Sequence, residues 1–190
     1  MVTKKAYHGG AFFNAIGSDF ATLEKSKEII SADVLDAWFD PSPKVIAKIK
    51  KFLPFSIKTS PPTQCEGLIK TIAKVRQIPE ENIIVGGGSS DLMFAFFPHI
   101  LKKSESVLIL DPTYGEYAHI FENVTENKII RHKLQKENDF KINYANLSEQ
   151  ITKEKPNLVM IVNPNSPTGQ YWTKQNILIL IKNFPNILFV

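Results

Sequence analysis

The sequence predicts an α/β fold, a three-layer α/β/α domain with a mostly parallel sheet. After Pro79, short apolar segments of strand length alternate with segments whose apolar residues recur at helical spacing. Strands separated by helices favour a parallel sheet that is covered on both faces. The chain has 190 residues, 43% of them hydrophobic, which is enough for one core.

The first 41 residues are predicted to form an N-terminal arm that precedes a domain over 42–190. The arm is irregular and rich in aromatic residues, and only Thr22–Ile30 has a helical pattern. Aromatic side chains on such an arm indicate that it packs on the rest of the fold or on a partner subunit.

Two helices are expected between the arm and Pro79. The first starts at Pro43, and Pro54 is expected to end it because proline has no backbone N–H to donate within a helix. The second is expected after Thr63, since Thr63 and Glu66 have the spacing of a capping box.

Beyond Pro79, strands are expected to alternate with helices. The expected strands are Ile83–Val85, Val107–Leu110, Lys128–His132, Leu158–Val162 and Ile187–Val190. The expected helices are Ser89–Leu101, Tyr114–Phe121, Leu147–Thr152 and Thr173–Asn183. Because no helix follows the last strand to cover the sheet, the domain is expected to be truncated at its C-terminus, and the isolated chain to be poorly soluble or to self-associate.

Three polar segments follow strands and are expected to share the carboxyl edge of the sheet, where open sheets bind ligands. Gly86–Asp91 joins a glycine turn to a helix start, whose free amides suit a phosphate. Asp111–Tyr117 places two tyrosines beyond the next strand, and Asn163–Gly169 is stiffened by two prolines. The set suits a flat aromatic cofactor carrying a phosphate, and each segment alone also suits a plain turn, cap or core-packing role.

The contacts expected of such a cofactor can be named. Tyr114 would stack on the ring, Asn165 or Ser166 would bond to a ring substituent, and Ser89 and Ser90 would add hydroxyl donors to the phosphate. The glycine turn is neither a Walker loop nor a Gly-x-Gly-x-x-Gly fingerprint, so the phosphate need not belong to a nucleotide.

Composition excludes several other classes of function. The net charge is only +4 and the lysines are spread along the chain, which gives no footprint for nucleic acid. Cys65 is the only cysteine, so no intrachain disulfide or cysteine-based zinc site is expected, and no metal site is predicted. No apolar run approaches the ~20 residues of a membrane helix, and no signal peptide is evident, so a cytoplasmic protein is expected.

The segments GGGSSD, DPTYGEY and NPNSPTG resemble, in order and spacing, those of the fold type I pyridoxal-phosphate aminotransferases of class I/II. The histidinol-phosphate aminotransferase and threonine-phosphate decarboxylase branch is the most similar, and the resemblance runs from about Ser42 to Val190. It implies the aminotransferase large domain and pyridoxal 5'-phosphate as cofactor. The residues that it implies for cofactor binding are Gly88, Ser89, Ser90, Asp91, Tyr114, Asn165 and Ser166. A short match at His8–Gly10 is similar to the arm of the decarboxylase members.

The chain also departs from the family pattern. The family usually has Asn at the position of Ser166, an Asp-Glu pair at Ser90-Asp91, and Asn-Glu-Asn-Pro where Asp36–Phe39 stands. The resemblance places the Schiff-base lysine beyond Val190, so no catalytic residue is predicted within the chain, which is expected to be an inactive fragment of a longer enzyme.

The expected function is that of a pyridoxal-phosphate-dependent aminotransferase. It would transfer an amino group between an amino acid, such as a phosphorylated or aromatic one, and a 2-oxo acid, and the complete enzyme would be a homodimer. One alternative is a decarboxylase of a phosphorylated amino acid. Alternatives of other classes are a non-catalytic phosphate-binding or interaction module and an unrelated nucleotide-binding α/β protein.

Overall fold

The computed structural model describes residues 10–19, 21–33, 37 and 39–190. The chain divides into two compact units, His8–Val85 and, in its larger part, Gly86–Val190. The sequence predicted a different division, an arm over 1–41 and a domain over 42–190. That boundary was placed where the sequence pattern changes, whereas the two units are defined by contacts in space, so the predicted division stays a prediction. The motif positions His8, Gly9, Asp36 and Trp38 lie outside the described residues.

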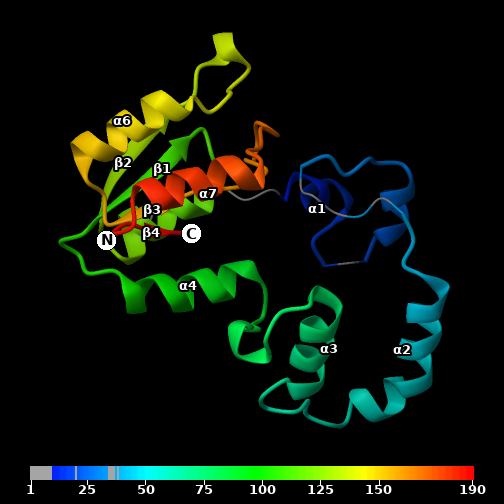
Figure 1. The fold of residues 1–190 in the computed structure, drawn as a ribbon. Helices are drawn as coiled ribbons and strands as arrows, with labels where there is room; N and C mark the ends of the chain where they lie inside the picture. Colours follow the sequence, from blue (N-terminus) through cyan, green and yellow to red (C-terminus); the bar gives the residue numbers. More distant parts are fainter. Residues whose placement is uncertain (1–9, 20, 34–36, 38) are drawn as a thin grey trace. The chain divides into compact units, whose positions relative to one another are not determined.

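The unit within His8–Val85 is helical among its described residues (Figure 1). Its α-helices are α1 (Ala11–Ile16), α2 (Pro43–Ser56) and α3 (Glu66–Arg76), with short 3-10 turns η1 (Leu23–Lys27) and η2 (Glu80–Asn82). The helix expected over Thr22–Ile30 is therefore only a 3-10 turn.

Two helix ends in this unit differ from the predictions. Pro54 does not end α2, which continues to Ser56. Proline removes one backbone hydrogen bond, and α2 continues beyond this proline for only Phe55 and Ser56. Thr63 does not cap α3, which begins at Glu66 after Cys65 with no side-chain cap. Spacing alone cannot show whether the threonine adopts the backbone angles of a cap.

Gly86–Val190 forms the predicted α/β fold around a four-stranded sheet (Figure 1). The strands are β1 (Ser106–Asp111), β2 (Lys128–Lys133), β3 (Leu158–Met160) and β4 (Leu188–Phe189). The helices are α4 (Ser89–Ile100), α5 (Gly115–His119), the π-helical turn η3 (Ile120–Val124), the 3-10 turn η4 (Lys136–Asn138), α6 (Tyr144–Glu154) and α7 (Lys174–Asn183). The strand order is β2-β1-β3-β4 and every pairing is parallel.

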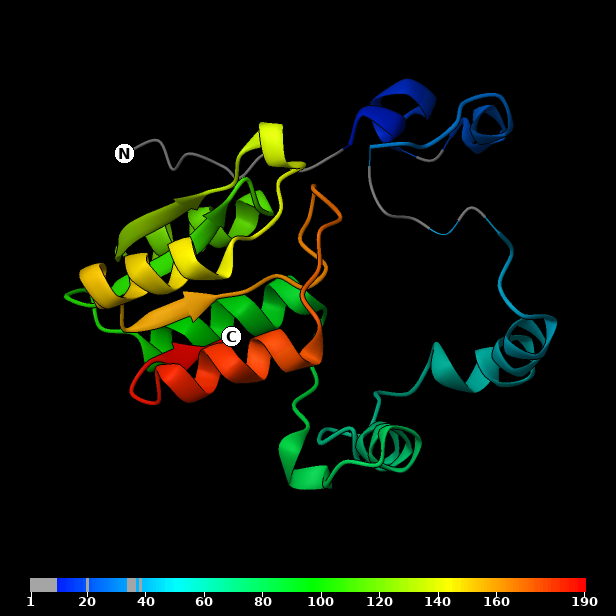
Figure 2. The ribbon, with the colours of Figure 1, turned by 45° about the horizontal axis from the view of Figure 1, so that its top comes forward.

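Helices cover both faces of this sheet, as predicted, and alternate residues of β1 divide between them. Val107 and Ile109 pack with Phe97 of α4 and with η3. Leu108 faces the other way and packs with α6 and α7 through residues such as Leu147 and Leu180. Figure 2 shows α6 and α7 together along one side of the strands. The predicted three-layer α/β/α arrangement is confirmed.

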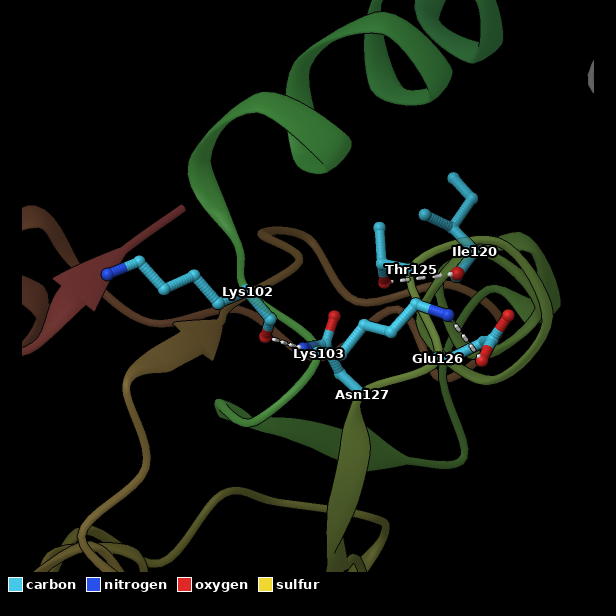
Figure 3. A network of polar contacts seen from close by, with 6 residues as sticks. All are labelled: Lys102, Lys103, Ile120, Thr125, Glu126 and Asn127. Atoms are coloured by element: carbon cyan, nitrogen blue, oxygen red, sulfur yellow. Dashed lines mark hydrogen bonds and ion pairs between the residues drawn. The ribbon is translucent and has the colours of Figure 1, made fainter.

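The amino edge of the sheet is closed by its own turns (Figure 3). The Asn127 amide donates to the carbonyl oxygens of Lys102 at 2.6 Å and Glu105 at 3.0 Å. Lys103 pairs with Glu126 at 2.8 Å beside it. These contacts tie the turn before β1 to the turn before β2.

One predicted strand is absent. Ile83–Val85 is not part of the sheet, and Ile84 is 76% exposed. Ile83 has extended backbone angles, but a strand also needs a neighbouring ladder, and a β-branched run does not reveal whether one is present.

No helix among the described residues is both long and apolar enough to cross a bilayer.

Candidate functional site

Hydrogen bonds join all three sequence-predicted segments beyond the carboxyl ends of β1 and β3. The glycine turn at the start of α4 is linked to the segment after β1 through Ser90 and Glu116. That segment is linked in turn to the segment after β3 through Thr113 and Asn165. The topology therefore brings Ser90, Tyr114 and Asn165 into one connected group, as the sequence predicted.

The glycine turn leads into the free amides of a twelve-residue helix. Gly88 has a φ of 130°, a region that L-residues rarely adopt, and it occupies the position before α4, so neither Ser89 nor Ser90 is the N-cap. The amides of Ser89, Ser90 and Asp91 fall in the first turn of α4, where no preceding carbonyl is available to them. They fit the chemistry of a phosphate.

The turn is also held by its own helix. The Gly87 amide donates to the Asp91 carboxylate at 2.8 Å. A Cβ added at Gly86 would come within 2.8 Å of the Leu92 side chain and 2.9 Å of that carboxylate. A side chain at Gly86 would thus displace the Leu92 and Asp91 side chains, and Asp91 fixes the shape of the turn rather than pointing a free carboxylate at a ligand.

Glu116 joins the helix start to the predicted ring-stacking residue. It is only 6% exposed, and its Oε2 accepts hydrogen bonds from the Ser90 and Tyr114 hydroxyls, both at 2.9 Å. Tyr114 also meets Tyr117 edge-on, with ring centroids 5.6 Å apart and an interplanar angle of 80°. The Tyr114 ring is therefore fixed at its hydroxyl and along its edge.

Burial and Glu116 raise the pKa values of both phenols of this group. Burial, followed by the hydrogen bond and the charge of Glu116, raises the pKa of Tyr114 to about 12. Burial and the same charge raise the pKa of Tyr117. At neutral pH the Tyr114 hydroxyl is thus a hydrogen-bond donor and its ring is uncharged.

Asn165 is 1% exposed and links the two strand-end segments. Its Oδ1 accepts from Thr113 Oγ1 at 2.9 Å, and its Nδ2 donates to the Pro112 carbonyl at 2.9 Å and to Thr168 Oγ1 at 3.0 Å. In this arrangement the amide is already engaged by protein groups. The ring contact predicted for Asn165 or Ser166 stays a prediction, and Ser166 is half-buried.

Sequence reasoning missed Glu116 and Thr113. Each acts through a partner that is distant in sequence, 26 residues for Glu116 with Ser90 and 52 residues for Thr113 with Asn165. No local sequence pattern predicts contacts between residues so far apart in the chain.

A pocket of about 350 Å³ elsewhere in this unit is lined by none of the predicted site residues. Its lining is Ile142, Tyr144, Trp172, Asn176 and Ile179. Among the described residues, no group of three or more His, Cys, Asp or Glu side chains could hold a metal ion.

The family model described as "Aminotransferase class I and II" matches residues 32–190. The chain belongs to this family. Its resemblance to the fold type I pyridoxal-phosphate aminotransferases is thereby confirmed, and the alternative of an unrelated nucleotide-binding protein is removed. Pyridoxal 5'-phosphate is the cofactor of the family.

Among the curated relatives, histidinol-phosphate aminotransferase of Clostridium novyi is 29% identical over 162 residues. The match covers 85% of this chain and 45% of the relative, so the chain spans less than half of that relative's length.

Two solved structures share the fold. One is histidinol-phosphate aminotransferase from Sinorhizobium meliloti in complex with pyridoxal-5'-phosphate, with a TM-score of 0.68 at 18% identity over 81% of this chain and 41% of that one. The other is L-threonine-O-3-phosphate decarboxylase from Porphyromonas gingivalis, with a TM-score of 0.62 at 20% identity over 80% of this chain and 45% of that one.

Proposed function

We propose that Gly86–Val190 supplies the phosphate and ring contacts for pyridoxal 5'-phosphate in an aminotransferase. The reaction would move an amino group between an amino acid, such as a phosphorylated or aromatic one, and a 2-oxo acid. The observation that carries this proposal is the hydrogen-bonded convergence of the α4 start, Tyr114 and the Asn163–Gly169 loop at one sheet edge.

The residues present fit the cofactor in kind. Gly88 and the first-turn amides of Ser89, Ser90 and Asp91 would hold the phosphate, and the helix dipole would favour its negative charge. Tyr114 would lie against the ring, and Ser166 would offer a hydroxyl to a ring substituent. When bound, the cofactor supplies an electron sink for chemistry at the amino-acid carbon, and the protein supplies binding and orientation.

The curated relatives favour amino-group transfer over the alternative, decarboxylation of a phosphorylated amino acid. The relative described above is a histidinol-phosphate aminotransferase, a name that implies a phosphorylated amino-group donor for that protein. We extend this substrate class to the present protein, as a cytoplasmic homodimer.

Titration of the purified chain with pyridoxal 5'-phosphate, followed by absorbance and fluorescence, tests the proposal. We expect saturable binding that inorganic phosphate displaces, with the cofactor bound more tightly than phosphate because the ring adds contacts. A module that binds only phosphate would hold both equally, and absence of saturable cofactor binding would contradict the proposal outright.

Replacing Ser89 separates its amide from its hydroxyl. Ser89 is the first residue of α4, a position where helices accept proline readily, so Ser89→Pro removes one amide donor without breaking the helix. We expect Ser89→Pro to abolish cofactor binding, and Ser89→Ala to weaken it by about 1 kcal/mol, the size of one hydroxyl hydrogen bond. The measurement is the dissociation constant for pyridoxal 5'-phosphate; equal losses in the two variants would place the phosphate elsewhere.

A further inference from the structure

Glu116 is a buried carboxylate that none of the proposed cofactor contacts uses. Burying a charged carboxylate is costly unless donors compensate for the lost water. Here one oxygen, Oε2, takes a hydroxyl from Ser90 in α4 and another from Tyr114 after β1. The start of α4 and the segment after β1 are therefore tied to the same atom.

We propose that Glu116 is a positioning residue that holds the Tyr114 ring in register with the phosphate-binding start of α4. This inference rests on the proposed function. Glu116 itself need not touch the cofactor, since it acts through the side chains of Tyr114 and Ser90.

The geometry of Tyr114 supports this role. The residue precedes α5 in the N-cap position with extended ψ, so its backbone does not belong to the helix. Its ring direction is set by side-chain contacts, among them the hydroxyl bond to Glu116 and the edge contact with Tyr117. Removing Glu116 takes away the hydrogen bond at the hydroxyl end of the ring, whereas the edge contact with Tyr117 does not depend on it.

Ser90 is the second residue whose hydroxyl is bonded to Glu116. Its hydroxyl hydrogen is given to Glu116 at 2.9 Å, so toward a phosphate Ser90 offers its backbone amide rather than its hydroxyl donor. A phosphate ion would also feel the negative charge of Glu116 as repulsion. Glu116 therefore benefits a ligand that has a ring to stack, and it gives no benefit to phosphate alone.

Affinities for pyridoxal 5'-phosphate and inorganic phosphate, measured on the same variants, test this distinction. Glu116→Ala and Tyr114→Ala should each weaken cofactor binding about fivefold, the scale of one aromatic stacking contact. Phosphate binding should be unchanged or tighter in Glu116→Ala. The variant carrying both changes should lose no more cofactor affinity than either single variant, because both remove the same contact.

A second readout needs no ligand. Ultraviolet titration of the phenols, assigned by difference from Tyr114→Phe, should give a Tyr114 pKa of about 12 in the unaltered chain. In Glu116→Gln, which keeps the shape of the side chain, this pKa should fall toward 10 while staying above it, because burial persists. Glu122→Gln is the matched control: Glu122 is exposed and bonded to Arg131, and its replacement should leave the titration unchanged.

The outcomes separate the two proposals. If the unaltered chain binds the cofactor no more tightly than phosphate, the cofactor ring makes no contacts that add affinity, and the proposed function is wrong. If the cofactor binds as expected but the Tyr114 pKa is unmoved in Glu116→Gln, or the double variant shows the sum of two losses, the role assigned to Glu116 is wrong. Circular dichroism on each variant shows whether the fold is retained, and Glu116→Gln decides the question if Glu116→Ala does not fold.

Discussion

Replacing Phe97 by alanine is expected to lower the free energy of unfolding by about 4 kcal/mol, the usual cost of removing a buried aromatic side chain. Phe97 is 1% exposed in the layer between α4 and the sheet. Its ring meets that of Phe121 edge-on with centroids 4.8 Å apart. Urea denaturation followed by circular dichroism measures the change.

The neighbouring Phe96 provides a matched control, since it is 41% exposed and differs from Phe97 by one helical position. Phe96→Ala should cost less than about 1 kcal/mol. Similar losses at the two positions would mean that α4 presents a different face to the sheet. The start of α4 would then point away from Tyr114, and the proposed phosphate site would lose its geometric basis.

The sheet could be predicted because its strands are recognisable from their local sequence as short apolar runs. The run Val107–Leu110 is apolar throughout, as expected of a strand that is covered on both faces, and it became the centre of the sheet. The helices α6 and α7 were found from their apolar spacing, although α6 extends beyond the predicted Leu147–Thr152 at both ends. Caps and fraying turns decide such boundaries, and they depend on backbone angles.

The errors share a physical cause. Ile83–Val85 has the composition of a strand, but no ladder in the described chain accepts it. Thr63 has the spacing of a cap, yet Cys65 takes that position in a left-handed conformation. In both places the local sequence is compatible with the predicted structure. The structure that forms is decided by tertiary contacts and backbone angles, which the local sequence does not reveal.

At the candidate site the sequence predicted the participating segments and missed what joins them. The glycine turn, the tyrosine segment and the Asn-Pro loop could be predicted because glycine, proline and hydroxyl residues follow apolar runs there. The joining groups, Glu116 and Thr113, bond across long sequence separations. Their role depends on which strands become neighbours, and this is a property of the folded sheet.

Asn165→Ala is expected to lower the free energy of unfolding by about 3 kcal/mol, since it deletes three hydrogen bonds in a site that water does not reach. The Pro112 carbonyl and the Thr113 hydroxyl lose the Asn165 amide, and the Thr168 hydroxyl keeps only the hydrogen bond from the Gln170 amide. Each buried group left without a partner costs ~1–3 kcal/mol, and partial relaxation toward water limits the sum.

Two companion variants sharpen this test. Thr113→Val removes one of the three bonds and leaves Asn165 Oδ1 without its donor, so its loss should be about 1 kcal/mol. Asn186→Ala changes an exposed asparagine and should stay within about 0.5 kcal/mol of the unaltered chain.

The same variants distinguish two roles for Asn165. If it only clamps the loops, cofactor affinity in Asn165→Ala and Thr113→Val should fall in proportion to the loss of stability, because both act by loosening the Asn163–Gly169 loop. If Asn165 contacts the cofactor ring directly, Asn165→Ala should lose affinity well beyond that proportion. Since its amide is engaged by Pro112 and Thr168, we expect the proportional result, with Ser166 left as the residue of this loop that meets the ring.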